Sequence, residues 1–142
     1  MQGNPNVMRF VRPKPNTYKE SIADLDFCIA NYKPKSEFLI YAVLRKHDSR
    51  FIGSVALVKT KDGKDEIGYR LLESEWGKGY GKEMALGLIT YCKSIGMKEL
   101  VAFAAYENEG SIKILEGLGF TYKKDFFAED LQIQERKYTL TL

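Results

Sequence analysis

The sequence predicts a single α/β (α+β) domain on a mixed, mostly antiparallel sheet, and three observations support this. The chain has 142 residues, which suits one ordinary domain, and no linker or repeat divides it. Three successive β-rich runs with turn residues between them predict a meander. A helical pattern then separates two strand-like runs, which predicts a crossover between parallel strands. We expect one domain over residues 1–142, with residues 1–6 as a loose tail.

The N-terminal part is interpreted from its apolar spacing. The run VMRFVRP alternates apolar and polar residues and then meets proline, so we expect a first strand that ends in a turn. From Thr17 to Asn31 the apolar residues recur at helical spacing, and Pro34 follows, which predicts a helix that ends before this proline.

The meander comprises the runs EFLIYAVLRK, RFIGSVALVKT and DEIGYRLL. A polar turn at His47 and Asp48 separates the first two runs. Asp62 and Gly63 separate the second from the third, and this pair suits the positive φ of a hairpin turn. We therefore expect each strand of the meander to pair with its neighbour in the chain.

The pattern after the meander is helical. The apolar residues that share one face of this helix are Met84, Ala85, Leu88, Ile89 and Cys92. Gly96 is suited to end the helix, and the apolar run KELVAFAAY follows as a buried strand. Because a helix connects them, this strand and DEIGYRLL should be parallel neighbours.

A short helix and two strands complete the order. Asn108 or Ser111 can cap the helix, and Gly119 is suited to end it. The runs FTYKKDFFA and QIQERKYTLTL are expected to be the last two strands, joined by a loop at residues 128–131.

Composition excludes several classes of function. The net charge of +3, from 22 basic and 19 acidic residues, does not indicate a nucleic-acid partner. No apolar run approaches the ~18 residues of a membrane span. Cys28, Cys92 and the single His47 lack metal-site spacing, so we expect no metal and two buried thiols in a reducing cytoplasm.

The glycine-rich run WGKGYGK joins the third meander strand to the long helix. It does not fit a Walker A loop, because Glu83 stands where Ser or Thr is needed, and its spacing does not fit G-x-G-x-x-G. Free N–H groups at a helix start favour an anion, and Lys78 and Lys82 add positive charge. We interpret the loop as a pyrophosphate site, with a tight turn that binds nothing as the alternative.

The segment from Glu66 to Phe120 resembles the core of the GNAT family of N-acetyltransferases. Its glycine loop is similar to the family's pyrophosphate loop, with Trp76 in place of the usual Arg or Gln, and NEGSIKILEGLGF is similar to a further motif. With GYRL before it, the Trp76 departure resembles the branch of ribosomal-protein N-terminal acetyltransferases. The resemblance implies a central sheet splayed at its one parallel strand pair, with helices on both faces.

The resemblance also implies that acetyl-CoA binds as the acetyl donor. The residues expected to contact it are Leu71, Leu72, Gly77, Lys78, Gly79, Tyr80, Gly81, Lys82, Asn108 and Ser111. Leu71 and Leu72 would act through the main chain, because the family's strand bulges here and pairs with the pantetheine arm. Asn108 would bind this arm, cap its helix, or do both.

The resemblance implies two catalytic side chains. Glu66 is the candidate general base for the amine, and a solvated carboxylate beside the hairpin is the alternative. Leu115 stands at the position of the family's usual acid, a tyrosine, so that acid is absent. Ser111 matches the serine, three residues after the motif asparagine, that has this role in the resembled branch, and is the candidate acid for the leaving thiolate; a serine that only satisfies a backbone group in the first helical turn is the alternative. Tyr106, or no acid at all, is the alternative. Cys92 lies on the apolar helix face and is a poor nucleophile, so we expect direct transfer.

The acceptor is expected to be a primary amine, either a small molecule or a protein N-terminus. Strand alternation puts Glu66, Gly68 and Arg70 on one face, and Gly68 leaves space for a substrate beside Glu66. The short connection at residues 32–36 predicts an open acceptor side. A non-catalytic CoA-binding or regulatory module is the rival function, and a homodimer is possible.

Overall fold

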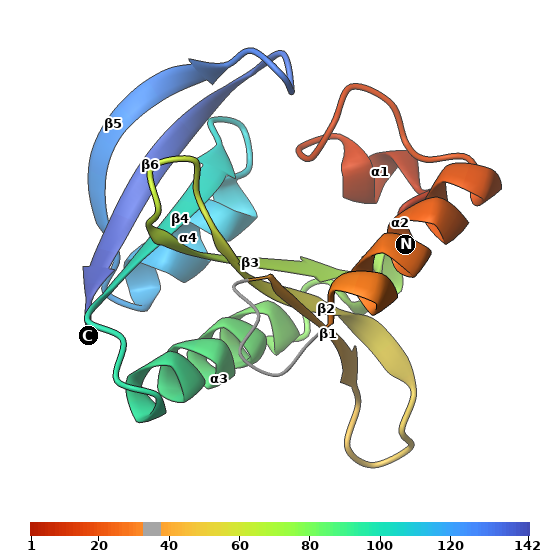
Figure 1. The fold of residues 1–142 in the computed structure, drawn as a ribbon, viewed down its shortest axis with the longest axis horizontal. Helices are drawn as coiled ribbons and strands as arrows, with labels where there is room; N and C mark the ends of the chain where they lie inside the picture. Colours follow the sequence, from red (N-terminus) through yellow and green to blue (C-terminus); the bar gives the residue numbers. More distant parts are fainter. Residues whose placement is uncertain (33–37) are drawn as a thin grey trace.

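The computed structural model describes residues 1–32 and 38–142, which form a mixed six-stranded sheet with helices on both faces (Figure 1). The strands in sheet order are β1 (Leu39–Leu44), β2 (Phe51–Lys59), β3 (Asp65–Leu71), β4 (Glu99–Ala105), β6 (Ile133–Thr141) and β5 (Thr121–Ala128). The predicted meander is confirmed, because β1, β2 and β3 pair antiparallel in chain order. Gly63 has a φ of +75° in the turn between β2 and β3.

The single parallel pair lies at the centre of the sheet, between β3 and β4. Its register contains one pair of residues, Glu66 with Val101, so the strands diverge beyond this point. The predicted splay is confirmed. The expected bulge in β3 is not seen on its other side, because β2 and β3 stay in continuous register from Lys59–Asp65 to Gly53–Leu71.

In the part of the chain that the structure describes, four α-helices and a short 3-10 helix accompany the sheet: α1 (Pro5–Met8), α2 (Tyr18–Asn31), η1 (Glu73–Glu75), α3 (Tyr80–Ser94) and α4 (Glu109–Gly117). Thr17 and Glu20 form a capping box that starts α2 where the sequence predicts it. Gly96 and Gly119 follow α3 and α4 with φ of +83° and +88°, as expected of helix ends.

The core lies between the sheet and the pair α3 and α4. Its buried residues are Leu57, Ile67, Leu88, Ile89, Cys92, Leu100, Ala102, Ala104, Ile112, Leu115, Phe120 and Tyr138. The odd-numbered side chains of β3 and the even-numbered side chains of β4 therefore face these helices. Glu66, Gly68 and Arg70 face the other side of the sheet, where α1 and α2 lie (Figure 1).

The predicted first strand is wrong, because residues 5–8 form helix α1. The Asn4 side chain accepts hydrogen bonds from the N–H groups of Asn6 and Val7, and Pro5 occupies the first helical turn. This local cap outweighs the apolar alternation, and Val7 and Met8 are buried from the helix. The N-terminal residues, expected as a loose tail, make contacts: Asn4 and Asn6 donate to the Glu73 carboxylate at 2.8 and 2.7 Å.

The predicted short connection at residues 32–36 lies outside the described residues, apart from Tyr32, which ends α2. Within the described ranges, no helix has the length and apolar character needed to cross a membrane.

Candidate functional site

A cavity of about 780 Å³ lies where β3 and β4 diverge. Its walls come from α1, β3, the glycine loop, the start of α3, β4, the start of α4 and Glu135 of β6. The predicted site residues that line it are Glu66, Leu71, Gly77, Gly79, Tyr80, Gly81, Lys82, Asn108 and Ser111. The divergence of two strands thus brings together residues that lie 45 positions apart in the chain.

The glycine loop ends at the start of α3, which no side chain caps. Gly77 and Gly79 have φ of +72° and +84°, and a Cβ at either would meet no atom within 4 Å. These two glycines are therefore needed for their backbone conformation, not for space. The first N–H groups of α3 have no partner within the helix and add to the positive end of its dipole. This is a suitable site for a phosphate group.

Gly81 is constrained by packing instead. A Cβ on Gly81 would lie 2.9 Å from Cδ1 of Ile114 in α4 and 3.7 Å from Cδ1 of Leu71 in β3. The absence of a side chain lets the first turn of α3 approach both elements. A larger residue at position 81 would push the start of α3 away from Ile114 and Leu71, which line the cavity.

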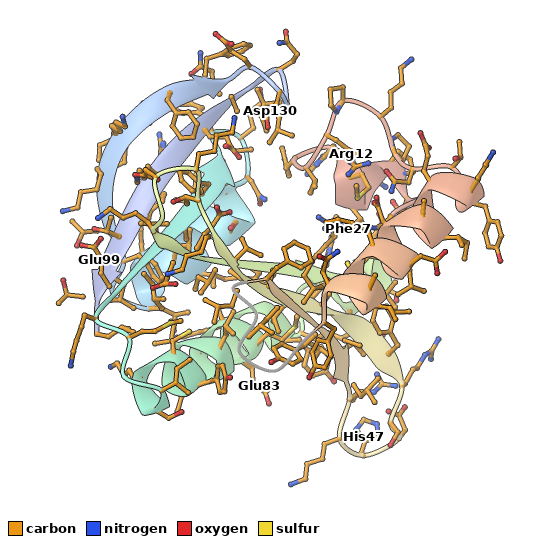
Figure 2. The ribbon with its side chains drawn as sticks, viewed as in Figure 1. Arg12, Phe27, His47, Glu83, Glu99 and Asp130 are labelled. Atoms are coloured by element: carbon orange, nitrogen blue, oxygen red, sulfur yellow. The ribbon has the colours of Figure 1, made fainter. Side chains whose placement is uncertain are left out.

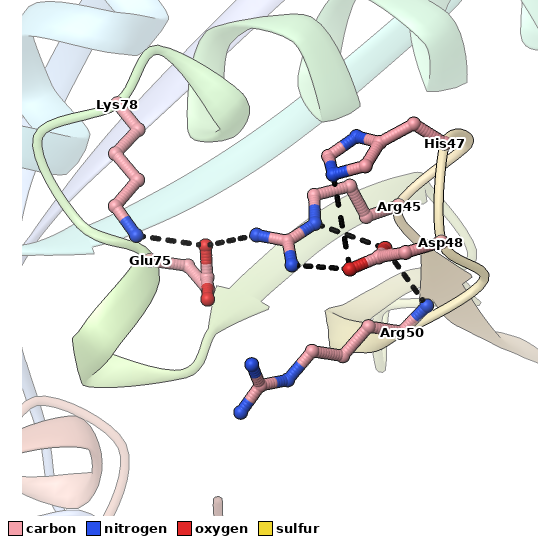
Figure 3. A network of polar contacts seen from close by, with 6 residues as sticks. All are labelled: Arg45, His47, Asp48, Arg50, Glu75 and Lys78. Carbon is pink, nitrogen blue, oxygen red and sulfur yellow. Dashed lines mark hydrogen bonds and ion pairs between the residues drawn. The ribbon is translucent and has the colours of Figure 1, made fainter.

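The two lysines of the loop differ in position. Lys82 is exposed and lines the cavity, so it can meet an anion there. Lys78 does not line the cavity: its Nζ lies 3.1 Å from Oε2 of the buried Glu75 (Figure 3). Arg45 reaches the same Glu75 oxygen at 3.5 Å. Lys78 thus anchors the loop from behind rather than facing a bound pyrophosphate.

The network behind the loop extends to the hairpin that joins β1 and β2. Arg45 also binds Asp48, and this pairing holds the pKa of the Asp48 carboxyl well below its usual range (Figure 3). His47 lies at the tip of the hairpin, 3.7 Å from Asp48 and away from the cavity (Figure 2). The expectation of His47 in a polar turn is confirmed.

Main-chain groups of β3 face the gap at alternate residues. Leu72 donates its N–H to the Ile52 carbonyl at 2.9 Å, and its carbonyl accepts from the Glu75 N–H at 2.9 Å, so both main-chain groups of Leu72 already have partners within the protein. In an antiparallel ladder the next residues alternate, so the peptide groups of Leu71 and Tyr69 face β4. The Trp76 indole donates to the Leu71 carbonyl at 3.3 Å. The Leu71 N–H is therefore the main-chain donor of this pair that a ligand can reach.

Glu66 lies at the closed end of the gap, in register with Val101. It is half-buried and lines the cavity, and its carboxylate makes no ion pair or hydrogen bond with the described residues. Burial raises the pKa of Glu66, and nearby Lys137 opposes part of this shift. A half-buried carboxylate that lines a cavity and has no partner among the described residues is suited to accept a proton.

Glu135 is a second carboxylate that the sequence analysis did not select. It lies on β6 opposite Ala105 of β4 and lines the same cavity as Glu66. Burial raises the pKa of Glu135 to about 7, with further contributions from the charges of Glu66 and Asp130. Nothing in the local sequence predicts this position, because it depends on the pairing of β6 with β4.

Ser111 and Tyr69 form a polar pair on the wall of the cavity. The Ser111 Oγ and the Tyr69 hydroxyl lie 3.0 Å apart. The Ser111 N–H donates to Oδ1 of Asn108 at 3.2 Å, so Asn108 caps α4 as predicted. Tyr106, the alternative acid, does not line the cavity, and its ring lies under the Arg136 guanidinium at 4.3 Å. The sequence analysis missed Tyr69, because its partner lies 42 residues away.

Positive side chains complete the wall on the side of α1. Arg9 and the half-buried Arg70 line the cavity, together with the apolar residues Val7, Phe10 and Val11. The sequence places Arg70 on the same face as Glu66, but nothing in it predicts that α1 would cover this face.

The remaining reactive groups lie elsewhere. Cys92 is fully buried in the core, and burial raises the pKa of its thiol to about 11, which makes it a poor nucleophile as predicted. Across the described residues, no group of three or more His, Cys, Asp or Glu is placed to hold a metal ion.

Comparison with known families gives one match along most of the chain. The model of the acetyltransferase (GNAT) domain matches residues 1–121. A curated relative, an uncharacterized N-acetyltransferase p20 of Bacillus licheniformis, is 28% identical over 120 residues, which are 82% of this chain and 67% of the relative.

Solved structures share the fold. An acetyltransferase of the GNAT family from Bacillus anthracis has a TM-score of 0.82 at 17% identity, covering 99% of this chain and 84% of that one. The acetyltransferase of Salmonella typhimurium that modifies the N-terminal serine of ribosomal protein L7/L12 has a TM-score of 0.80 at 14% identity, covering 99% and 84%. A microcin C7 self-immunity acetyltransferase, solved with acetyl-CoA and AMP, has a TM-score of 0.79 at 18% identity, covering 96% and 79%.

Proposed function

The chain belongs to the acetyltransferase (GNAT) family, and on that premise we propose that it transfers an acetyl group from acetyl-CoA to a primary amine, with Glu66 as the general base. Acetyl transfer from acetyl-CoA is the activity that the family implies. One observation supports the assignment of roles more than any other. The gap between β3 and β4 is closed at Glu66 and opens toward the glycine loop, so one cavity joins an anion site to a half-buried carboxylate.

Each part of acetyl-CoA has a chemically suitable partner among the groups that line the cavity. The start of α3 and Lys82 suit the pyrophosphate of CoA, which is the charged part of the donor. The N–H groups of Leu71 and Tyr69 face the gap, where the amide groups of the pantetheine arm need partners. The thioester would then lie toward Glu66. Leu72 and Lys78 are not part of this proposal, because both are engaged elsewhere.

The reaction is a direct transfer. The neutral amine attacks the thioester carbonyl carbon, a C–N bond forms, and the C–S bond breaks as the CoA thiolate leaves. Glu66 takes the proton that the amine nitrogen loses, directly or through a water molecule. This role suits Glu66, because burial raises the pKa of its carboxyl toward the working range of a base.

Ser111 and Tyr69 are proposed to donate a proton to the leaving thiolate. Ser111 is the candidate acid that the sequence identifies. The Tyr69 hydroxyl lies 3.0 Å from the Ser111 Oγ and can replace the proton that Ser111 gives to the thiolate. The gain from this pair is expected to be small, because a thiol is acidic enough to leave as the anion.

Glu135 is proposed to bind the acceptor as it arrives. An amine is mostly an ammonium ion near neutral pH, and two carboxylates on the cavity wall attract a cation. The acceptor class stays open between a small amine and a protein N-terminus. The ribosomal-protein branch stays a prediction, supported by one solved structure at 14% identity.

The activity is tested by following the release of free CoA from acetyl-CoA in the presence of a panel of amines. Calorimetry with acetyl-CoA alone measures donor binding in parallel. Amine-dependent release of CoA, together with an acetylated product, supports the proposal. Binding of acetyl-CoA without turnover on any amine favours a non-catalytic CoA-binding or regulatory module instead.

A further inference from the structure

We propose that Arg70 forms a subsite for an anionic group of the acceptor, so that the preferred acceptor is an amine that also carries a carboxylate or a phosphate. This inference rests on the proposed function, because it concerns the acceptor end of the same cavity. It is carried by the position of Arg70, by the space between Arg70 and Glu66, and by the lack of a dedicated carboxylate partner for Arg70.

Glu66, Gly68 and Arg70 form one side of the cavity. All three line it, and strand alternation places them on the same face of β3. At ~3.3 Å per residue, the Cα atoms of Glu66 and Arg70 lie about 13 Å apart. A negative and a positive side chain thus face the acceptor region from the two ends of one strand segment. Such an arrangement complements a molecule with an amine at one end and an anion at the other.

The space between the two charges is open because residue 68 is glycine. Gly68 does not have a positive φ, so its backbone conformation does not require glycine. A Cβ added there would have only one neighbour within 4 Å, Cβ of Ala56 at 3.9 Å, which is ordinary contact. Neither backbone nor packing therefore demands glycine at this position. Its missing side chain leaves room for a ligand to extend from Glu66 to Arg70.

Arg70 makes no ion pair and no hydrogen bond through its side chain with the described residues, although it is half-buried. The carboxylate whose charge favours it is Asp24 of α2. Oδ2 of Asp24 already accepts from Asn16 at 2.8 Å and from Gln2 at 3.2 Å, and it lies 3.8 Å from Arg12. The carboxylate near Arg70 is thus shared among three other groups.

Other positively charged side chains lie near Arg70 at this end of the cavity. Burial lowers the pKa of Arg70, and the charge of Arg12, which lies beside α1 (Figure 2), lowers it further. Arg9 lines the same cavity. Burial of an unpaired guanidinium is costly, and an anion brought by the substrate removes that cost. The planar fork of an arginine matches a carboxylate or a phosphate with two parallel hydrogen bonds.

The test uses acceptors that differ only in the anion. Linear ω-amino carboxylates of increasing length are compared with their own carboxamides, and ω-aminoalkyl phosphates form a third series. For wild-type enzyme we expect kcat/KM to be at least about tenfold higher for the best anionic acceptor than for its neutral analogue. The series with the larger preference, carboxylate or phosphate, identifies the anion.

Arg70→Gln should bring kcat/KM for the anionic acceptor and kcat/KM for its neutral analogue to within about threefold of each other. The change should come mainly from a higher KM for the anionic acceptor. Arg12→Gln is the matched control: it removes a charge from the same region but not from the cavity wall, and the preference should persist. Gly68→Val should raise the acceptor KM and leave the Kd for acetyl-CoA unchanged. This second variant tests the open space without a change of charge.

The possible failures can be told apart. If wild-type enzyme acetylates neutral and anionic amines equally well, the Arg70 subsite is refuted and the proposed function stands. If Arg70→Gln keeps the full preference, the subsite is also refuted. If wild-type enzyme binds acetyl-CoA but acetylates no amine in any series, the proposed function fails, and the subsite fails with it.

Discussion

Glu66 of β3 stands in register with Val101 of β4, in the one residue pair that joins these two parallel strands. This pair closes the gap at one end, and the glycine loop and the start of α3 lie at the other. The carboxylate that we propose as the base therefore lies at the closed end of the cavity.

Gly79→Ala should weaken acetyl-CoA binding and destabilise the protein by about 1 kcal/mol, because Gly79 has a φ of +84° at the start of α3. The matched control is Gly87→Ala within α3, where the φ is not positive and a Cβ meets no atom within 4 Å. That change should stabilise the helix by up to about 1 kcal/mol. Chemical denaturation and calorimetry with acetyl-CoA measure both effects. Equal effects of the two changes would refute the conformational role of Gly79.

Ser111→Ala and Tyr69→Phe should each lower kcat by about tenfold or less, because the leaving thiol is itself acidic. The two hydroxyls are 3.0 Å apart and act as one pair, so the double variant should lose little more than either single variant. Steady-state rates on one amine decide this. A double variant whose loss is the product of the single losses would show that the hydroxyls act independently.

The rate should depend on pH through the two carboxylates of the cavity. The pKa of Glu135 is raised to about 7 and that of Glu66 is raised from its ordinary value, so both charge as the pH rises. We expect kcat/KM to rise through about pH 7 in wild-type enzyme. The charged groups that act on this pair are Asp130, near Glu135, and Lys137, near Glu66.

Glu135→Gln should remove the contribution of Glu135 to the step near pH 7 and leave only the pH dependence that Glu66 causes. The change should also raise KM for a cationic acceptor more than it lowers kcat, because Glu135 is proposed to bind and not to take the proton. A pH–rate profile that is identical in the variant and the wild type would contradict this role.

Glu135 should make the protein less stable at high pH, although its charge is expected to favour activity there. The folded-state pKa of Glu135 is above its ordinary value, so the associated stability is present at low pH and is lost as the pH rises through about 7. Glu135→Gln stays neutral and should stabilise the protein at pH 8. After allowance for solvent around a half-buried group, we expect about 1 kcal/mol, or a Tm about 3 °C higher. At pH 5 the difference between the two proteins should shrink.

Much of the fold was predictable from local patterns. The meander, the crossover through α3 and the order of the last elements follow from periodicity and from glycines that need positive φ, such as Gly63, Gly96 and Gly119. The first element was predicted wrongly, although Asn4 and Pro5 carry the signature of a helix start. The alternation of VMRFVRP favours a strand, but the cap at Asn4 and Pro5 stabilises a helix instead.

The site residues that could be predicted from the sequence come from one continuous segment of the chain. The glycine loop, Glu66 and the start of α4 lie in one stretch with recognisable motifs, and the structure brings them to one cavity. Glu135 and Arg70 were not selected, because their roles depend on the pairing of β6 with β4 and on the position of α1. The pairing of Lys78 with the buried Glu75 is not predictable, because Glu75 looks like an ordinary surface carboxylate in the sequence.

The most direct test of the central claim is the acetyl-transfer rate of Glu66→Gln on an amine that wild-type enzyme acetylates. Glutamine keeps the size of the side chain and removes the base, so kcat should fall by about 10²–10⁴-fold while the Kd for acetyl-CoA stays within about twofold. The residual rate should rise with pH as the amine itself loses its proton. A variant that keeps the wild-type rate between pH 6 and 8 with unchanged donor binding would show that Glu66 is not the base.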